Sequence, residues 1–288
     1  MAMKLLEALF ERMQSKVMSS GYLMADETTI PVLESLKPGS THKGYYWVYY
    51  SPVDKLISFQ YHKSREGEAV RQHIDKFKGY LQTDGYAGYY QFKNNPDIIL
   101  LACMAHARRK FYAALENDKE RAGHALELFG LLYDIETEAR ESKMDHEQRH
   151  ALRQKKALVV LQKLEDWLKE NQNKVLPKSA IGDAINYTLN LWPRLKRYTE
   201  YGKLEIDNNL IENKIRPIAL GRKNYMFAGS HEAARLAGMI YSFMAMCKVE
   251  EINPLEWLTD VLQNINNHSI LQLDELLPAN WKMKKNQA

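Results

Sequence analysis

The chain has 288 residues, of which 45% are hydrophobic and 26% are charged, a composition typical of a globular protein that buries a substantial core. Lys and Arg outnumber Asp and Glu by 40 to 36, and the formal net charge of +4 weakly indicates a polyanionic partner. The two cysteines are too few for a disulfide framework or a four-cysteine zinc site. The spacing of Cys103 and His106 imitates half a zinc site, but no second pair lies nearby in sequence.

The first residues are predicted to form an amphipathic surface helix over residues 1–21, with Gly21 as a candidate C-cap. Apolar side chains recur there at helical spacing, at Leu6, Phe10, Met13 and Val17. The sequence contains neither an apolar run of about 18 residues nor a small-residue cleavage site after a basic start. A membrane span and a secretory signal are therefore not expected, and the protein is predicted to be cytoplasmic.

Residues 22–103 carry the pattern of β-strands. Three antiparallel strands are predicted first, at residues 22–30, where Pro31 stops the strand, and at 45–50 and 56–61. A helix over about 64–77 and two short strands at 80–84 and 98–103 follow. The aromatic run of the second strand is more typical of core packing than of base stacking. This order predicts an α/β protein (an α+β mixed sheet), and ribonuclease H-like folds open in the same way.

From about residue 105 to 200 the pattern is helical, and no convincing strand appears there. We therefore expect an all-helical insertion in the sheet domain. Pro177 is predicted to break the pattern after one helix. The Trp192-Pro193 pair is predicted to end or kink another.

Beyond the insertion the sequence again predicts helices. Asp207 or an adjacent Asn is expected to cap a helix that carries Glu212 in its second turn. Two more helices are predicted over about residues 232–248 and 255–265, and a polar, frayed tail is expected to follow them.

Two aspartates stand where a sheet could present them to a ligand. Asp84 ends a predicted strand, and the following Gly85 allows a sharp turn that leaves the carboxylate exposed. Asp26 lies inside the first strand, where neighbouring side chains alternate between faces, so Asp26 and Glu27 cannot both face one site. Carboxylates from separate elements can hold two metal ions about 4 Å apart for phosphoryl transfer. The residues alone also fit turn-forming aspartates and a solvated Glu212.

Four motifs follow one another along the chain. They are ADET at residues 25–28, LQTDGYAGY at 81–89, AHARRKF at 105–111, and DNN at 207–209 continuing to GRKN at 221–224. In this order they resemble the transposase family of insertion sequence 66. The resemblance extends from about residue 20 to 280.

The resemblance implies a ribonuclease H-like catalytic fold with an all-helical insertion before the last catalytic helix. The catalytic domain would comprise residues 22–104 and 201–250, with the insertion at 105–200 and a C-terminal helical segment and tail at 251–288. It also implies a catalytic triad of Asp26, Asp84 and Glu212, and it favours Asp26 over Glu27.

The implied chemistry uses Mg²⁺ or Mn²⁺, held by Asp26, Asp84 and Glu212 in a two-metal site. Such enzymes hydrolyse a phosphodiester at the transposon end and direct the freed 3′-hydroxyl at target DNA, without a covalent protein intermediate. The implied partners are double-stranded DNA, as transposon ends and target, and further copies of the chain in a synaptic homo-oligomer.

Positive charge lies close in sequence to two of the proposed catalytic elements, and DNA phosphates are expected there. Any single one of these residues also fits an ordinary solvated surface. The predicted DNA-binding residues are Arg108, Arg109, Lys110, Lys214, Arg216, Arg222 and Lys223.

Three further residues are predicted to support the site. His106 is expected either to orient a phosphate or a catalytic carboxylate, or to be a hydrogen-bonded structural residue. Asn208 and Asn209 most simply cap the helix of Glu212, and they alternatively act as hydrogen-bond partners of the metal ligands.

Members of the family usually carry an additional N-terminal region with a coiled coil and a cysteine-rich, zinc-binding, DNA-recognising portion, and no segment of this sequence corresponds to it. Three functions therefore stay open. They are a metal-dependent transposase catalytic domain, a related nuclease without strand transfer, and an inactive DNA-binding or oligomerising remnant.

Overall fold

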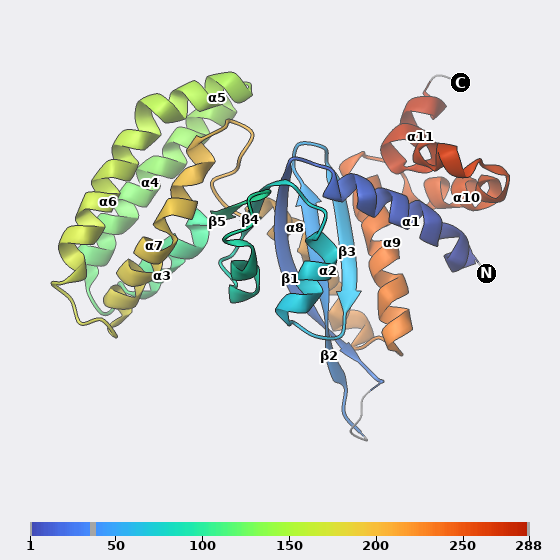
Figure 1. Cartoon of the computed structure of the whole chain (residues 1–288), viewed down its shortest axis with the longest axis horizontal. Helices are drawn as coiled ribbons and strands as arrows, with labels where there is room; N and C mark the ends of the chain where they lie inside the picture. The colour runs from blue at the N-terminus through green and yellow to red at the C-terminus, as the bar shows by residue number, and fades with distance from the viewer. Residues whose placement is uncertain (1, 35–38, 287–288) are drawn as a thin grey trace. The chain divides into compact units, whose positions relative to one another are not determined.

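The computed structural model describes residues 2–34 and 39–286. Met1 of the predicted N-terminal helix and residues 287–288 of the predicted tail lie outside the described residues. The chain divides into two compact units. The first unit comprises Met1–Leu81, Tyr86–Ile99 and Leu210–Ala288, and the second unit comprises Gln82–Gly85 and Leu100–Asn209. The α-helices and β-strands of both units are labelled in Figure 1.

Five strands form one sheet in the order β3-β2-β1-β4-β5. Their bounds are Tyr22–Val32 for β1, His42–Ser51 for β2, Leu56–His62 for β3, Gly79–Thr83 for β4 and Ile98–Ala102 for β5. The pairs β1 with β2 and β2 with β3 are antiparallel. The predictions of a mixed α/β class and of three leading antiparallel strands are confirmed.

Strand β1 runs through Pro31 to Val32, so the prediction that Pro31 stops it is wrong. Proline has no N–H to give to a sheet. The carbonyl oxygen of Pro31 nevertheless accepts a hydrogen bond of 2.8 Å from the N–H of Ala228, and Val32 and Ala228 form a parallel bridge. The segment after helix α8 (Asn209–Tyr225) thus supports this end of β1.

Helices of the first unit cover both faces of strands β1 to β3 (Figure 1). One face meets α2 (Gly67–Ile74) and the 3₁₀ helix η1 (Ala87–Phe92), where the ring of Trp47 lies 6.3 Å from that of Tyr89. On the other face the Tyr46 hydroxyl donates a hydrogen bond of 2.9 Å to the Ala234 carbonyl in α9 (His231–Val249). The neighbours Tyr46 and Trp47 thus point to opposite faces, as alternation requires. Both are almost fully buried, which confirms core packing.

The N-terminal helix α1 spans Ala2–Met18. Its predicted apolar face is buried, and Phe10 packs against Phe243 of α9 with ring centroids 6.1 Å apart. The helix ends three residues before Gly21, and beyond it the Ser20 N–H donates to the Val17 carbonyl, three residues back, at 3.2 Å. Gly21 does not have the positive φ of a left-handed cap, so the prediction of a C-cap there is wrong.

The C-terminal segment is folded throughout its described residues, and the prediction of a frayed tail is wrong. Helix α10 (Pro254–Asn264) is followed by the 3₁₀ helices η4 (Ile265–Asn267) and η5 (Ile270–Leu276) and by α11 (Pro278–Lys285). The indole N–H of Trp257 donates to the Leu276 carbonyl at 2.9 Å, and that of Trp281 donates to the Asp260 carboxylate at 2.6 Å. Two buried tryptophans therefore hold the segment together.

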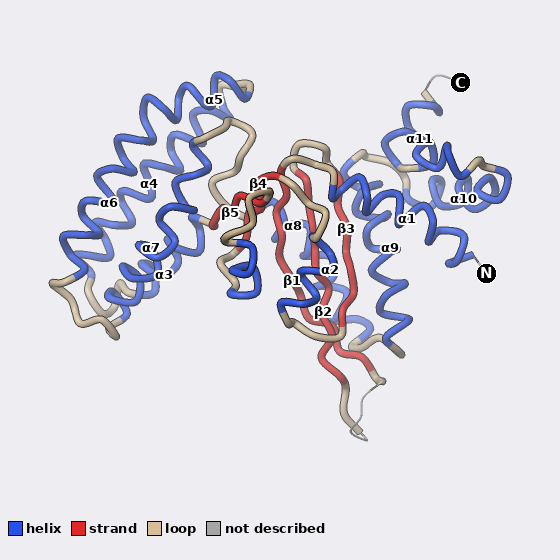
Figure 2. Tube along the Cα trace, viewed as in Figure 1, coloured by secondary structure: helices blue, strands red, loops and turns tan. Residues whose placement is uncertain are grey.

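Helices make up most of the second unit, and its described residues 105–200 contain no strand, as predicted (Figure 2). The elements are α3 (Met104–Ala113), α4 (Lys119–Glu141), α5 (His146–Leu152), the π-helical turn η2 (Arg153–Ala157), α6 (Leu158–Gln172), α7 (Ala180–Leu195) and η3 (Lys196–Thr199). Pro177 lies between α6 and α7, as expected. Helix α7 continues through Pro193 and ends two residues later.

A buried ionic network stabilises the second unit. The Glu136 carboxylate accepts hydrogen bonds of 2.6–2.9 Å from the guanidinium groups of Arg149 and Arg153. Burial on its own would raise the pKa of Glu136, but the hydrogen bonds and charges of the two arginines lower this pKa below its ordinary value. Arg149 also pairs with Glu205 at 2.7 Å, and Arg153 donates to the Tyr198 carbonyl at 2.7 Å. The network therefore fixes the segment that leads to α8.

Candidate catalytic and nucleic-acid-binding site

Asp26 stands in β1, on the face of the sheet that α9 covers. Asp26 lies beside Val48 of β2, and Val48 lies beside Phe59 of β3, so the three side chains share one face. The ring of Phe59 is 6.2 Å from that of Tyr241 in α9. The Asp26 carboxylate accepts a hydrogen bond of 2.8 Å from the N–H of Glu27.

Glu27 has a structural partner on the opposite face. Its carboxylate accepts a hydrogen bond of 2.6 Å from Nε of Arg65, and only 6% of its side chain is exposed. The Arg65 guanidinium lies 4.0 Å from the centre of the Tyr86 ring, and the Tyr86 hydroxyl donates to the Arg65 carbonyl at 2.7 Å. This ion pair explains Glu27 without catalysis and agrees with the choice of Asp26 as the candidate ligand.

Glu212 lies in the first turn of α8, not in the second turn as predicted, because the helix already begins at Asn209. A carboxylate in a first turn is favoured by the helix dipole. One half-turn further on, Nζ of Lys214 is 5.2 Å from the centre of the Tyr50 ring. Tyr50 is two residues from Val48 in β2 and so shares its face. The start of α8 therefore lies on the same side of the sheet as Asp26.

Asp84 follows the last residue of β4 in a turn of the second unit. Gly85 has a φ of 93°, a value that side chains rarely allow, and its N–H donates to the Thr83 hydroxyl at 3.3 Å. The Tyr187 hydroxyl of α7 donates to the Asp84 carbonyl at 3.1 Å. The backbone of this turn is thus held by its own residues and by one helix.

Asp26 and Glu212 belong to the first unit and Asp84 to the second. Within the described residues, no group of three or more His, Cys, Asp or Glu side chains is arranged to hold a metal ion. The donor chemistry does fit the predicted ions, because Mg²⁺ and Mn²⁺ prefer carboxylate oxygens. The triad as a metal site stays a prediction.

The segment before α8 has an arrangement that the sequence did not reveal. The Asp207 carboxylate accepts hydrogen bonds from the Tyr133 hydroxyl at 2.9 Å and from the backbone N–H and side-chain amide of Asn209 at 3.0 and 2.9 Å. Asp207 therefore performs the capping function at the start of α8, and the alternative of an Asn208-Asn209 cap is wrong.

Asn208 is fully buried, and neither atom of its side-chain amide has a hydrogen-bond partner in the described part of the chain. Its backbone N–H donates to the sulfur of Cys103 at 3.3 Å. Burying an amide without a partner costs about 1–3 kcal/mol. Such an amide in a folded protein calls for an explanation, and a supporting role in a site is one.

Cys103 precedes α3, and His106 lies in the first turn of that helix. Burial raises the pKa of the Cys103 thiol to about 12, so the thiolate that zinc requires is disfavoured. The resemblance of this pair to half a zinc site has no further support among the described side chains. The two proposed roles of His106 stay predictions.

The predicted basic residues fall into two groups. Arg108, Arg109 and Lys110 are exposed on α3, and Nζ of Lys110 is 5.4 Å from the centre of the Tyr187 ring. On α8, Arg216 and Lys223 are exposed.

Two of the basic residues on α8 contact other parts of the first unit. Burial, and secondarily the charge of Lys248, lowers the pKa of Lys214. Arg222 donates to the carbonyl and, at 2.8 Å, to the hydroxyl of Thr29 in β1. The contacts of Arg222 favour a structural role over the predicted contact with DNA.

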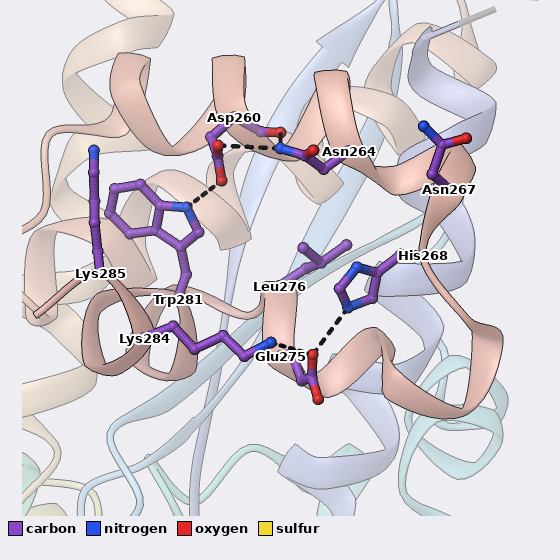
Figure 3. A pocket seen from close by; sticks show the side chains of 9 residues that line it. All are labelled: Asp260, Asn264, Asn267, His268, Glu275, Leu276, Trp281, Lys284 and Lys285. Carbon is purple, nitrogen blue, oxygen red and sulfur yellow. Dashed lines mark hydrogen bonds and ion pairs between the residues drawn. The ribbon is translucent and has the colours of Figure 1, made fainter. Parts of the chain in front are cut away.

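A cavity of about 410 Å³ lies in the C-terminal segment (Figure 3). Its charged groups largely pair with one another, since the Glu275 carboxylate contacts both Lys284 and, at 3.2 Å, His268. The Asp260 carboxylate accepts from Trp281 across the same cavity. These pairs stabilise the fold of the C-terminal segment, and they account for most of the charged groups that line the cavity.

No helix in the described ranges combines the length and apolar character needed to cross a membrane.

A mixed α/β sheet hosts many unrelated functions, so the fold and its carboxylates do not by themselves define the class of this protein. Comparison with family models narrows the class. Residues 1–236 match the model described as "Transposase IS66 family", and residues 242–279 match the "IS66 C-terminal element". The chain therefore belongs to the IS66 transposase family, which confirms the resemblance of the motifs.

Among curated proteins, the chain is similar to two from Sinorhizobium fredii. It is 32% identical to the uncharacterized protein y4jD over 96% of this chain and 57% of that protein. It is 31% identical to the uncharacterized protein y4qI over 96% of this chain and 54% of that protein. The chain spans about half the length of these relatives. No solved structure matches it.

Proposed function

We propose that this chain is the catalytic portion of a DDE-type DNA transposase with a ribonuclease H-like fold. Membership of the IS66 transposase family over nearly the whole chain supports the proposal. The strand order, with three leading antiparallel strands, supports the fold. The observation that supports the site is that Asp26 and the start of α8, whose first turn contains Glu212, lie on the same side of the sheet.

In this proposal Asp26, Asp84 and Glu212 hold Mg²⁺ or Mn²⁺, which when bound neutralises the charge that develops on the phosphate. A water oxygen attacks the phosphorus at the transposon end, the bond to the 3′-oxygen breaks, and the proton passes to that oxygen. The freed 3′-hydroxyl then attacks a target phosphorus and displaces the target's own 3′-oxygen, which takes up the proton of the attacking hydroxyl. Exposed basic residues of α3 and α8 bind the DNA phosphates, and copies of the chain assemble on the two ends.

The test uses DNA from the borders of the mobile element that encodes the chain. Wild-type protein is expected to nick this DNA with Mg²⁺ or Mn²⁺, and Asp84→Asn is expected to lower the rate by more than about a hundredfold. Asp166→Asn, on an exposed position of α6, is the matched control and should cleave normally. Equal cleavage by Asp84→Asn and wild type contradicts the site.

A second assay supplies a pre-cut 3′-hydroxyl end and a target plasmid. Joined product is expected from a transposase. Cleavage without joining would replace the proposal by a nuclease of the same fold. Salt-sensitive DNA binding without cleavage under either metal would replace it by an inactive remnant.

A further inference from the structure

Helices α3 and α4 of the second unit line an open cavity of about 570 Å³, here called the α3–α4 cavity. One wall is a single face of α3, because its residues recur at helical spacing. The opposite wall is a face of α4, and the first residue of α8 completes the lining. The lining residues are Ala105, Arg108, Arg109, Tyr112, Gly130, Tyr133, Asp134 and Asn209.

Three charged side chains of the α3–α4 cavity form no ion pair with another described residue. No ion pair of the described residues involves Arg108, Arg109 or Asp134, whereas Arg149 and Arg153 in the same unit are fully engaged. Guanidinium groups on an exposed helix face bind phosphate oxygens, often in pairs. The cavity therefore differs from the one in the C-terminal segment, whose charged groups largely pair with each other.

The cavity also presents aromatic rings and a polar acceptor beside these cations. The Tyr112 side chain is 65% exposed. Tyr133 is held in place by its hydrogen bond of 2.9 Å to Asp207. Phenol rings stack on nucleobases, and an Asp carboxylate can accept a hydrogen bond from an exocyclic amino group of a base.

The space beside Gly130 is open. A Cβ added at Gly130 would meet no atom within 4 Å. A cavity of a few hundred cubic ångströms is in the range that holds a small ligand. A nucleotide combines a phosphate and a planar ring in one unit, which matches this lining.

We propose that the α3–α4 cavity binds one unpaired nucleotide of a DNA strand, with its phosphate on Arg108 and Arg109 and its base inserted toward Gly130 between Tyr112 and Tyr133. The inference rests on the proposed function, because it specifies how a DNA strand engages the helical insertion. Besides the phosphate contacts, it gives the insertion a site for a base that has left the stacked DNA helix.

The test measures equilibrium binding of two labelled strands without metal. One strand is an abasic deoxyribose-phosphate backbone, and the other carries a single cytosine at its centre. Wild-type protein is expected to bind the base-bearing strand about tenfold more tightly, the order of one base stacked on an aromatic ring.

Gly130→Leu places a side chain in the open space beside Gly130, where the base is proposed to insert, and is expected to abolish this tenfold preference while retaining salt-dependent binding of the abasic strand. Gly123→Leu is the matched control, because Gly123 lies on the same helix, has no atom within 4 Å of an added Cβ, and does not line the cavity. It should behave as wild type. If Gly130→Leu does not fold, Tyr112→Ala at an exposed position serves instead and should reduce the preference at least threefold.

Equal binding of the two strands by wild type, or an unchanged preference in a folded Gly130→Leu protein, overturns the inference. The outcome is separable from that of the proposed function. If the protein prefers the base-bearing strand but does not cleave DNA with metal, the nucleotide site is retained and the catalytic proposal is rejected. If the protein cleaves DNA but shows no base preference, the catalytic proposal is retained and the nucleotide site is rejected.

Discussion

The Tyr187 hydroxyl donates a hydrogen bond of 3.1 Å to the carbonyl oxygen of Asp84. Tyr187 belongs to a helix of the insertion, and Asp84 carries one of the proposed catalytic carboxylates. Within the same turn the Gly85 N–H donates to the Thr83 hydroxyl at 3.3 Å. Helix α7 therefore contributes directly to the position of the Asp84 backbone.

Tyr187→Phe removes this hydrogen bond and leaves the ring in place. We expect the free energy of unfolding to fall by about 0.5–1.5 kcal/mol. The cleavage rate should fall by roughly three- to tenfold, and more Mg²⁺ should be needed for half the maximal rate, because the carboxylate is held less firmly. Cleavage rates over a magnesium series measure both effects. Tyr45→Phe is the control, and an unchanged magnesium dependence in Tyr187→Phe would refute a positioning role.

Glu136→Gln leaves the guanidinium groups of Arg149 and Arg153 without their buried counter-charge. Removing one partner of a buried ion pair costs about 3–5 kcal/mol, and we expect a loss of this size in urea unfolding. Glu138→Gln on the same helix is the matched control. Its side chain is 41% exposed and pairs with Lys156, so it should cost less than about 1 kcal/mol. Similar losses in both variants would contradict the importance of the network.

The same network predicts the acid stability of the protein. The pKa of Glu136 is lower in the folded chain than its ordinary value of 4.5. Its stabilisation is therefore fully present above pH 4.5 and is lost as the pH falls from there through the folded pKa. The difference in unfolding free energy between wild type and Glu136→Gln should shrink below pH 4.5. A constant difference down to strongly acidic pH would argue against a charged Glu136.

Asn208→Leu replaces a buried amide that has no partner by an apolar side chain of similar size. We expect the melting temperature to stay the same or rise, because the desolvation cost of about 1–3 kcal/mol disappears. Cleavage should nevertheless fall, if the amide serves a group that arrives with the substrate. Asn171→Leu is the contrast. It loses hydrogen bonds of 3.0 Å from Arg121 and 2.9 Å to the Trp167 carbonyl, and it should melt earlier. Normal cleavage by Asn208→Leu would leave this amide without a role.

Arg222 and its neighbour Lys223 should respond differently to alanine. Arg222→Ala loses the bonds to Thr29 and is expected to lower the melting temperature. Lys223→Ala should leave the melting temperature unchanged, weaken DNA binding, and reduce the slope of log affinity against log salt by about one. Melting curves and DNA titrations at several salt concentrations test the pair. An unchanged slope of log affinity against log salt in Lys223→Ala would show that Lys223 does not contact a DNA phosphate.

The sequence predicted the elements whose signal is local. The alternation of β1 to β3 and the helical spacing of α1 are properties of neighbouring residues, and both were confirmed. The errors concern ends that distant residues decide. Pro31 stays in a strand because Ala228 donates to its carbonyl. The final segment is ordered because Trp281 reaches Asp260.

In the candidate site, too, local sequence predicted some features and distant residues decided the others. Alternation indicated that Asp26 and Glu27 face opposite ways, and the motif favoured Asp26. The partner that explains Glu27, Arg65, lies in a loop whose approach no local pattern reveals. Similarly, the motif DNN left Asp207 and the adjacent asparagines as alternative caps, and the structure uses the carboxylate of Asp207. Hydrogen-bond partners depend on tertiary structure. The roles of neighbouring residues such as Asp26 and Glu27 are therefore distinguished only in the folded protein.

The first unit is discontinuous in the chain, with the helical insertion between its strands and the helices α8 and α9. A ribosome therefore makes the strands long before the helices that cover one of their faces. Until α9 emerges, the aromatic side chains of Tyr46 and Phe59 have no cover on that face. The helical unit, whose residues emerge earlier, can complete its own core in the meantime. Messages truncated before α8 should thus yield an aggregation-prone product, so production of a folded protein depends on complete translation.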